Sequence, residues 1–412
     1  MRVHIIPFFS PLAQSKWKTS VVNQLAESGA QIITPEDFLN KELKRNRTVL
    51  DQHNYIFVGT GGTENFIAPF LSKTKLRPPI ILLSYDRNNS LPAAMETRAY
   101  LHQNHFTSRI IHATLPQLIE RIREWCEFAE IETNIRNSRI GIVGKPSSWL
   151  IASSVNPSAV QQRWGVTIEE YPLTKIVDNL KDKLSEEYKV TLDQFIGRAA
   201  CSDIPEDEIR KAGLVTQALL EFVRKNNLDA MTLECFTLLE KINITGCHAL
   251  SHLNDLAGFT AGCEGDVPTT FTMMLAKLLT QRPVFMANVV DVDIDAHSVV
   301  FAHCTVPTTI LEGYEITTHF ESGKSMAIRG KFNPQEITVL KVFGEDLSDF
   351  WISRGVITEN LTNEQGCRTQ IRVRLTESVS YFLEESLANH HVVIPGDHYR
   401  KLQEFFSFTF RQ

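Results

Sequence analysis

The 412-residue sequence has no dominant charge and no cysteine spacing of the zinc-ribbon kind. Its 42 basic and 48 acidic residues are interspersed and give a net charge of -6, so no electrostatic footprint for nucleic acid or an anionic membrane stands out. The seven cysteines, from Cys126 to Cys367, form no CxxC pair, which argues against a disulfide framework and favours a reducing compartment. We therefore expect a cytoplasmic protein with a small-molecule partner.

Long apolar runs are also missing. No uncharged window of roughly 18 residues occurs, and residues 1–7 lead directly into a predicted strand without the apolar region of a signal peptide, so neither export nor membrane insertion is expected. Hydrophobic content of 43% with 22% charged residues is typical of globular proteins. Because single cores usually stop growing at roughly 250 to 300 residues, the length predicts two or three domains.

The first part of the chain, residues 1–135, alternates short apolar runs with helical patterns. Residues 3–7, 55–58 and 80–83 have the composition of buried strands, and segments such as 93–101 have helical periodicity. Strands that alternate with helices in this way form parallel sheets covered by helices. We predict a flavodoxin-like or Rossmann-like domain.

A glycine-rich loop, Gly59-Thr60-Gly61-Gly62-Thr63-Glu64, joins one of these strands to a helix. It is not GxGxxG, and no Walker lysine follows it. Two interpretations remain open: a tight strand-to-helix turn that requires glycine, or a backbone cradle for an anion or a sugar hydroxyl.

A second alternating series begins at residue 140, after the charged stretch 130–139, which has the composition of a linker. We predict a second α/β domain over residues 136–282. Trp149 follows the first strand of this domain, and open α/β sheets bind ligands just beyond the carboxyl ends of their strands. Trp149 is therefore either part of a pocket wall or a core residue.

From residue 283 the pattern changes to two-residue alternation with turn residues, in which strands follow strands. We predict a β-rich third domain over residues 283–412, an antiparallel sheet or barrel, closed by helices at 379–387 and 398–406. The whole chain is thus predicted to be α/β: two doubly wound parallel-sheet domains followed by the β-rich domain.

Possible metal ligands gather in the late part of the chain, since carboxylates and imidazoles are the usual ligands of Mn²⁺, Mg²⁺ and Zn²⁺. They are Glu264, Asp266, Asp291, Asp293, Asp295, His303, His390 and His391. Asp266 precedes a helical pattern and is expected mainly as its cap. Cys263 and Cys304 each neighbour a possible ligand and are expected as small buried side chains.

Six short motifs, in order along nearly the whole chain, carry a family resemblance. They are Gly59-Thr60-Gly61-Gly62-Thr63-Glu64, Asn89-Ser90-Leu91-Pro92-Ala93-Ala94-Met95-Glu96, Pro146-Ser147-Ser148-Trp149-Leu150, Cys263-Glu264-Gly265-Asp266, Ala302-His303-Cys304 and Ala388-Asn389-His390. With them the sequence resembles the L-fucose/L-arabinose isomerase superfamily, in particular its shorter fucose isomerase-like members.

The resemblance implies aldose–ketose isomerisation with Mn²⁺ or another divalent metal, through an ene-diol. It also implies a homo-oligomer in which a neighbouring subunit's first domain covers the site. By the family's pattern Glu264 is the first metal ligand and the acid/base group, His390 is a further ligand, and Asn389 contacts the sugar.

The sequence departs from the fucose isomerase pattern at Asn288, where that pattern has an aspartate ligand. An amide oxygen can bind a metal but cannot act as a base. The rival set, by the arabinose isomerase spacing, is Asp291 with His303, although in a regular strand Asn288 and Asp291 would face opposite sides unless a bulge intervenes. Two hypotheses follow: a working isomerase, or a sugar-binding or regulatory protein that kept the fold and lost catalysis.

Overall fold

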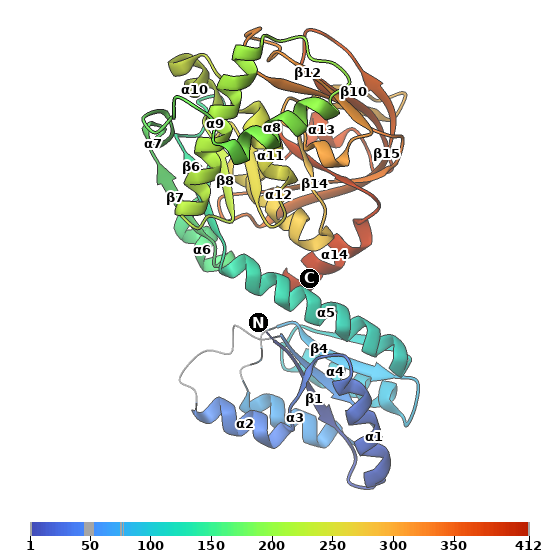
Figure 1. Cartoon of the computed structure of the whole chain (residues 1–412). Helices are drawn as coiled ribbons and strands as arrows, with labels where there is room; N and C mark the ends of the chain where they lie inside the picture. Colours follow the sequence, from blue (N-terminus) through green and yellow to red (C-terminus); the bar gives the residue numbers. More distant parts are fainter. Residues whose placement is uncertain (1, 45–52, 75, 77, 411–412) are drawn as a thin grey trace. The chain divides into compact units, whose positions relative to one another are not determined.

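The computed structural model describes residues 2–44, 53–74, 76 and 78–410 (Figure 1). The chain forms two compact units. One consists of Met1–Asn134 together with Glu404–Gln412, and the other of Ile135–Gln403. The predicted boundary between residues 282 and 283 falls inside the second unit, between a helix and the first strand of a barrel.

The first unit is built on a five-stranded parallel sheet with the strand order β2-β1-β3-β4-β5. The strands are β1 (Val3–Phe8), β2 (Gln31–Ile32), β3 (His53–Val58), β4 (Ile80–Tyr85) and β5 (Ser108–Ala113). The helices are α1 (Ser15–Ala26), α2 (Pro35–Lys44), α3 (Glu64–Lys73), α4 (Ser90–Gln103) and α5 (Leu115–Arg136), joined by the end of α14 (Tyr399–Phe410). This is the flavodoxin-like order of a doubly wound sheet.

The glycine-rich loop makes the tight turn between β3 and α3. A side chain at position 59 would place its Cβ 2.3 Å from the Phe9 ring, so the backbone approach requires glycine there. The amide of Gly61 donates to the carbonyl of Asn88 at 2.8 Å. A Cβ at position 61 would lie 3.0 Å from that of Asn89, so packing accounts for both Gly59 and Gly61.

The second unit begins with a four-stranded parallel sheet in the order β7-β6-β8-β9. Its strands are β6 (Arg139–Val143), β7 (Thr167–Tyr171), β8 (Ala230–Leu233) and β9 (Thr260–Cys263). Its helices are α6 (Pro157–Trp164), α7 (Thr174–Val177), α8 (Glu186–Arg198), α9 (Glu206–Lys225), α10 (Cys235–Ile242), α11 (Cys247–Asp255) and α12 (Val267–Thr280). The sequence did not predict β9, because Thr-Ala-Gly-Cys lacks the bulky residues typical of strands.

The predicted linker at 130–139 was wrong. Helix α5 continues to Arg136, and β6 starts at Arg139. Glu130 is exposed, but the carboxylate of Glu132 is buried and lies 2.7 Å from Nε2 of His53. Phe128 and Ile135 are buried on the same side of the helix, at helical spacing. The charged residues of this stretch therefore belong to a helix with one buried side, and not to a linker.

The rest of the second unit is a closed antiparallel barrel in the order β10-β11-β16-β15-β14-β17, with a separate β12-β13 hairpin. The strands are β10 (Phe285–Asp293), β11 (Ser298–His303), β12 (Gly313–Thr317), β13 (Ala327–Lys331), β14 (Glu336–Phe343), β15 (Asp349–Leu361), β16 (Thr369–Leu375) and β17 (His391–Pro395). The helix predicted at 379–387 is only the short α13 (Tyr381–Glu384). Parallel sheets followed by a barrel confirm the predicted fold class.

Helix α12 joins the two parts of the second unit. It packs against β9 of the parallel sheet and against β14 and β17 of the barrel. Its residues from Val267 to Ala276 are all buried, as expected for a helix that is apolar around its whole circumference. Its N-terminus is thereby held rigidly where sheet and barrel meet.

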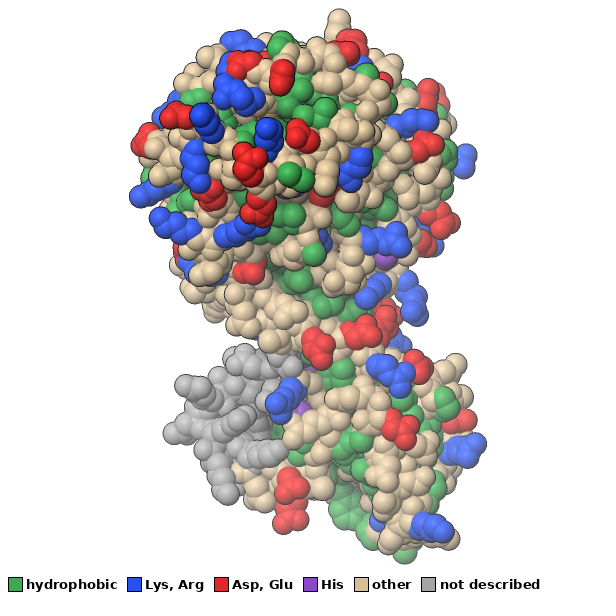
Figure 2. Space-filling model, in the orientation of Figure 1, with side chains coloured by type: hydrophobic (Ala, Val, Ile, Leu, Met, Phe, Trp, Pro, Cys, Tyr) green, Lys and Arg blue, Asp and Glu red, His purple; other side chains and the backbone are tan. Residues whose placement is uncertain are grey.

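Among the described residues, no helix combines the length and the apolar character needed to span a membrane. On the face drawn in Figure 2, basic and acidic side chains alternate over the surface without a large area of one sign.

Candidate functional site

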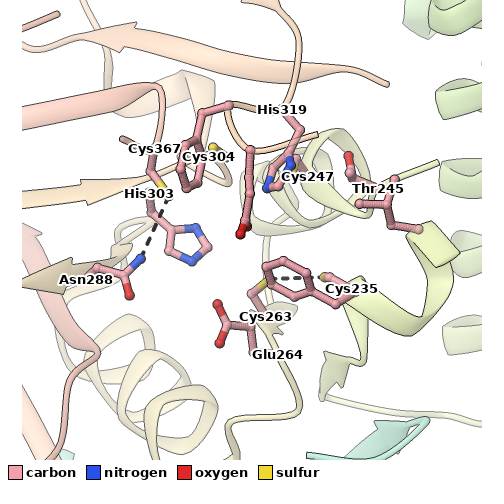
Figure 3. Close-up of a pocket in the computed structure, with 14 residues that line it drawn as sticks. Cys235, Thr245, Cys247, Cys263, Glu264, Asn288, His303, Cys304, His319 and Cys367 are labelled. Atoms are coloured by element: carbon pink, nitrogen blue, oxygen red, sulfur yellow. Dashed lines mark hydrogen bonds between the residues drawn. The ribbon is translucent and has the colours of Figure 1, made fainter. Parts of the chain in front are cut away.

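A pocket of about 130 Å³ lies in the second unit, where the carboxyl ends of β8 and β9 meet the barrel (Figure 3). Glu264, Asn288 and His303 line it, together with His319 and five cysteines. Carboxyl ends of parallel strands are where open α/β sheets bind ligands, so the location agrees with the general rule.

Glu264 reaches this pocket because of a sharp turn at the end of β9. Its φ is +62°, the left-handed region, and Gly265 follows with φ +73°. A side chain at Gly265 would place its Cβ 2.4 Å from Pro146, and the amide of Ser147 donates to the Glu264 carbonyl at 2.8 Å. A non-glycine residue in this conformation costs on the order of 1–3 kcal/mol, which is typical of functional sites.

Trp149 donates its indole N–H to Oε2 of Glu264 at 2.6 Å. The indole is 53% exposed and packs edge-to-face on Phe236. The structure thus places Trp149 beside the pocket rather than in the core, and one carboxylate oxygen of Glu264 is fixed by it.

His390 approaches the other oxygen of Glu264 from the barrel side. Its Nε2 atom lies 3.7 Å from Oε1 of Glu264, is buried and has no hydrogen-bond partner among the described residues. Its Nδ1 atom lies 2.9 Å from Oδ2 of Asp266. A carboxylate on Nδ1 fixes the proton there and leaves the Nε2 lone pair directed toward Glu264.

Asp266 has two roles. It caps α12 by accepting from the amide of Thr269, as the sequence predicted, and it also holds His390. Burial raises the pKa of its carboxyl, but the nearby ammonium of Lys341 and the His390 imidazole outweigh burial and keep that pKa well below its usual range. Asp266 therefore stays ionised inside the protein.

Lys341 is fully buried, and no local sequence pattern predicted its role. Its Nζ donates to Oγ1 of Thr269 at 2.9 Å, and that hydroxyl donates to Asp266 at 2.8 Å. Burial lowers the pKa of Lys341, and the negative charge of Asp266 opposes that shift. The cation balances the buried carboxylate that orients His390.

His303 stands at the end of β11 on the pocket's far wall. Its ring is 5.7 Å from that of His390, and its Nδ1 is 2.8 Å from the Thr305 hydroxyl. Burial lowers the pKa of His303 to about 3, so the ring is neutral. One of its nitrogens can therefore act as a ligand.

Asn288 and Asn389 form a pair. The Asn389 amide donates to Oδ1 of Asn288 at 2.5 Å, and its own Oδ1 accepts from the amide of Val289 at 3.1 Å. The Asn288 amide also faces the sulfur of Cys367 at 3.9 Å. The pair joins β10 to the segment that carries His390.

Asp291 does not line the Glu264 pocket. A bulge at Val290 shifts the pairing of β10, so that Asn288 pairs with Ala302 and Asp291 with Val300, and the two side chains lie on the same face. Both line a neighbouring cleft of about 680 Å³. The bulge thus brings Asp291 toward Asn288 but leaves it outside the group formed by Glu264, His303 and His390.

Sequence reasoning missed that five of the seven cysteines converge on the pocket. They are Cys235, Cys247, Cys263, Cys304 and Cys367. The sulfurs of Cys263 and Cys235 are 3.0 Å apart, and that hydrogen bond together with burial raises the pKa of Cys263. Hydrogen bonds from Cys247 and Cys367 lower the pKa of Cys304. Four of these cysteines stand within two residues of a strand end and Cys247 begins helix α11, and this placement was the signal that the sequence offered.

The fold and the site together define an α/β protein with a carboxylate- and imidazole-lined pocket beside a closed barrel. Similar proteins include sulfoquinovose isomerases. The enzyme of Alkalicoccus urumqiensis is 20% identical over 220 residues, 52% of this chain and 49% of that enzyme. The enzyme of Priestia aryabhattai is 21% identical over 229 residues, 53% of this chain and 50% of that enzyme.

The chain therefore spans about half the length of the curated relatives it matches, with weak homology over that half. No protein-family model matches the sequence.

Proposed function

We propose that this protein is a divalent-metal-dependent aldose–ketose isomerase. The observation that carries the proposal is the 3.7 Å approach of the buried Nε2 of His390 to Oε1 of Glu264. With Nδ1 protonated toward Asp266, both facing atoms are electron-pair donors, and a cation between them removes their repulsion. The weak similarity to sugar isomerases supports the same chemistry.

The residues fit such an ion. Bonds of about 2.0–2.2 Å from nitrogen or oxygen to a metal allow two ligand atoms to lie up to about 4.2 Å apart. Glu264 and His390 satisfy this, and Asn288 lines the same pocket as the third candidate ligand. When bound, a metal such as Mn²⁺ holds and polarises the sugar's carbonyl and adjacent hydroxyl.

Glu264 is the proposed acid/base group. Its carboxylate takes a proton from the carbon next to the carbonyl and returns it to the former carbonyl carbon, while the proton of the neighbouring hydroxyl passes to the former carbonyl oxygen, so that the aldose passes through an ene-diol to the ketose. The Trp149 N–H holds Oε2 during this transfer. Asn389, Trp149 and His303 are the proposed contacts to the sugar.

The cleft next to the pocket provides room for the rest of the sugar. It adjoins the pocket at Asn288 and Cys367 and is lined by side-chain amides, namely Asn288, Asn363, Gln365, Gln370 and Asn389. Amides both donate and accept hydrogen bonds, as sugar hydroxyls require. Among the described lining residues, only Arg372 of the cleft carries a positive charge. A neutral sugar and a sulfonated sugar are therefore both candidate substrates.

We further propose a homo-oligomer with sites near subunit interfaces, in the cytoplasm. Beside the pocket loop, Trp149 is 53% exposed and Ile151 is 90% exposed. Exposed apolar side chains next to a site favour cover by another chain.

The test is ketose formation over a panel of neutral aldoses and sulfoquinovose, with and without Mn²⁺. Glu264→Gln should abolish turnover, whereas Asp295→Asn, an exposed carboxylate in the β10–β11 turn, should not change it. The variants Asn288→Ala and Asp291→Asn then distinguish the two sets of metal ligands. Loss of turnover in Asn288→Ala supports the set with Asn288, and loss of turnover in Asp291→Asn supports the set with Asp291. No turnover with any sugar by correctly folded protein would refute the isomerase.

Asn288 itself favours one alternative, a sugar-binding or regulatory protein without catalysis, because an amide contributes no charge to the site. In that case sugars raise the melting temperature without metal, and Glu264→Gln keeps the shift. If instead Mn²⁺ raises the melting temperature and Glu264→Gln abolishes that shift, the metal site is established.

A further inference from the structure

We infer that the pocket contains a binding site for a thiophilic divalent cation, Zn²⁺ above all, formed by Cys263, Glu264 and His303. One ligand atom from each lies within 4.8 Å of the others. This inference about the zinc site is based on the positions of these three side chains. Its effect on catalysis, described below, rests on the proposed isomerase function.

The turn at the end of β9 makes this arrangement possible. Consecutive residues of a regular strand point to opposite faces, so Cys263 and Glu264 would normally diverge. The left-handed conformation of Glu264 breaks that alternation, and both side chains line the same pocket (Figure 3). His303 completes the group from the barrel side.

The donor set is that of zinc. Thiolate, imidazole and carboxylate are each zinc ligands, and zinc sites with three protein ligands keep one open position, while Mg²⁺ and Mn²⁺ prefer oxygen ligands. Binding of the metal releases the proton of the Cys263 thiol. Tetrahedral zinc places its ligand atoms about 3.3–3.7 Å apart, so closing the group needs side-chain movements of about an ångström. The Thr305 hydroxyl can accept from Nδ1 of His303, which leaves Nε2 as the ligand.

The surroundings are also suited to a soft ion. The Cys235 sulfur lies 3.0 Å from that of Cys263, and the sulfur of Met286 accepts from the Cys263 amide at 3.4 Å. The buried, unpartnered Nε2 of His390 also points at Glu264. These sulfur-rich surroundings favour a soft ion over a hard one.

Glu264 is shared with the proposed catalytic ion. A zinc ion held by Cys263 and His303 engages the carboxylate that would otherwise act with His390. Zn²⁺ is therefore expected to inhibit isomerisation in competition with Mn²⁺, and removal of the Cys263 thiol is expected to relieve that inhibition.

The experiment is titration of the metal-free full-length protein with Co²⁺, a spectroscopic substitute for Zn²⁺. Sulfur-to-cobalt charge-transfer absorption should appear with one equivalent and disappear when Zn²⁺ is added. Cys263→Ser should lose the band and weaken Zn²⁺ binding by at least about 10- to 100-fold, the loss seen even for residues that only support a ligand. Cys201→Ser, an exposed thiol outside the pocket, is the matched control and should change neither.

X-ray absorption of the zinc-loaded wild-type protein makes the test independent of any variant. It should show sulfur at about 2.3 Å with nitrogen or oxygen at about 2.0–2.1 Å. A shell without sulfur, a band that survives Cys263→Ser, or no Co²⁺ binding overturns the site. A different result would refute the isomerase proposal, namely the absence of turnover with Mn²⁺. That result does not depend on the cobalt spectrum.

Discussion

His390 and Asp266, 124 positions apart in the sequence, share a buried hydrogen bond of 2.9 Å. The same carboxylate caps helix α12, so the element that positions Glu264 and the loop that carries His390 are held by one side chain. The orientation of the proposed metal ligand His390 therefore depends on the charge state of Asp266.

The first prediction concerns that charge. Asp266→Asn preserves the helix cap but removes the anion that keeps a proton on Nδ1 of His390. The proton can then move to Nε2, where it blocks the lone pair that would bind the metal. We expect Mn²⁺ affinity to fall about 10- to 100-fold, measured by calorimetry, since residues supporting a ligand typically contribute that much. Unchanged affinity in a folded variant would show that the hydrogen bond does not orient the ligand.

The second prediction concerns Lys341. Lys341→Met leaves the buried carboxylate of Asp266 without its cation, and the free energy of unfolding should fall by about 3 kcal/mol in urea denaturation. The double variant with Asp266→Asn removes both charges and should lose less than the sum of the single losses, with a coupling of about 1–3 kcal/mol. Strictly additive losses would mean that the two charges do not interact.

The third prediction separates the indole N–H of Trp149 from its ring. Trp149→Phe keeps the packing on Phe236 but frees one oxygen of Glu264, and should reduce Mn²⁺ affinity or turnover by up to about tenfold, about 1.4 kcal/mol. The matched control is Trp164→Phe, because Trp164 donates to the carbonyl of Leu347, away from the pocket. That control should lower stability by about 1–3 kcal/mol and leave metal binding intact. The reverse pattern would contradict the role of Trp149.

The fourth prediction is acid sensitivity. Burial, with a smaller contribution from the charge of His252, lowers the pKa of His248 to about 3, well below its ordinary value. Below about pH 6.5 the unfolded chain then binds a proton at His248 that the folded chain does not bind. The contribution of the neutral His248 to the free energy of unfolding is therefore complete above about pH 6.5 and is lost as the pH falls toward 3. The slope is about 1.4 kcal/mol per pH unit for each such histidine.

Replacing His248 tests this pH dependence. His248→Gln should reduce the slope of unfolding free energy against pH, measured by urea denaturation between about pH 7.5 and 5. The exposed His102→Gln variant is the control and should leave the slope unchanged. Equal slopes in both variants would show that His248 does not contribute.

Most of the fold was predictable because its signals are local. Alternating strands and helices indicated the parallel sheets, and two-residue periodicity from residue 283 indicated the antiparallel part. Two strands were missed for physical reasons. The short β9 lacks bulky residues, and in β15 polar residues and a glycine interrupt the apolar ones, so that no regular two-residue alternation results.

The site was only partly predictable. Glu264, His303, Asn288 and His390 were singled out from the sequence, and the structure brings these side chains together around one pocket or its wall. The roles of Asp266 toward His390 and of Lys341 toward Asp266 depend on contacts between distant segments, which no local pattern encodes.

The sequence by itself determined most of the order of elements, the cap at Asp266 and the residue types available for chemistry, because periodicity and capping act over a few neighbouring residues. Only the tertiary structure decided which of these residues meet. The bulge at Val290 set the faces of Asn288 and Asp291, and barrel closure brought His390 to Glu264. Likewise, five cysteines between positions 235 and 367 line one pocket because strand ends of the parallel sheet and of the barrel, together with the start of helix α11, converge there.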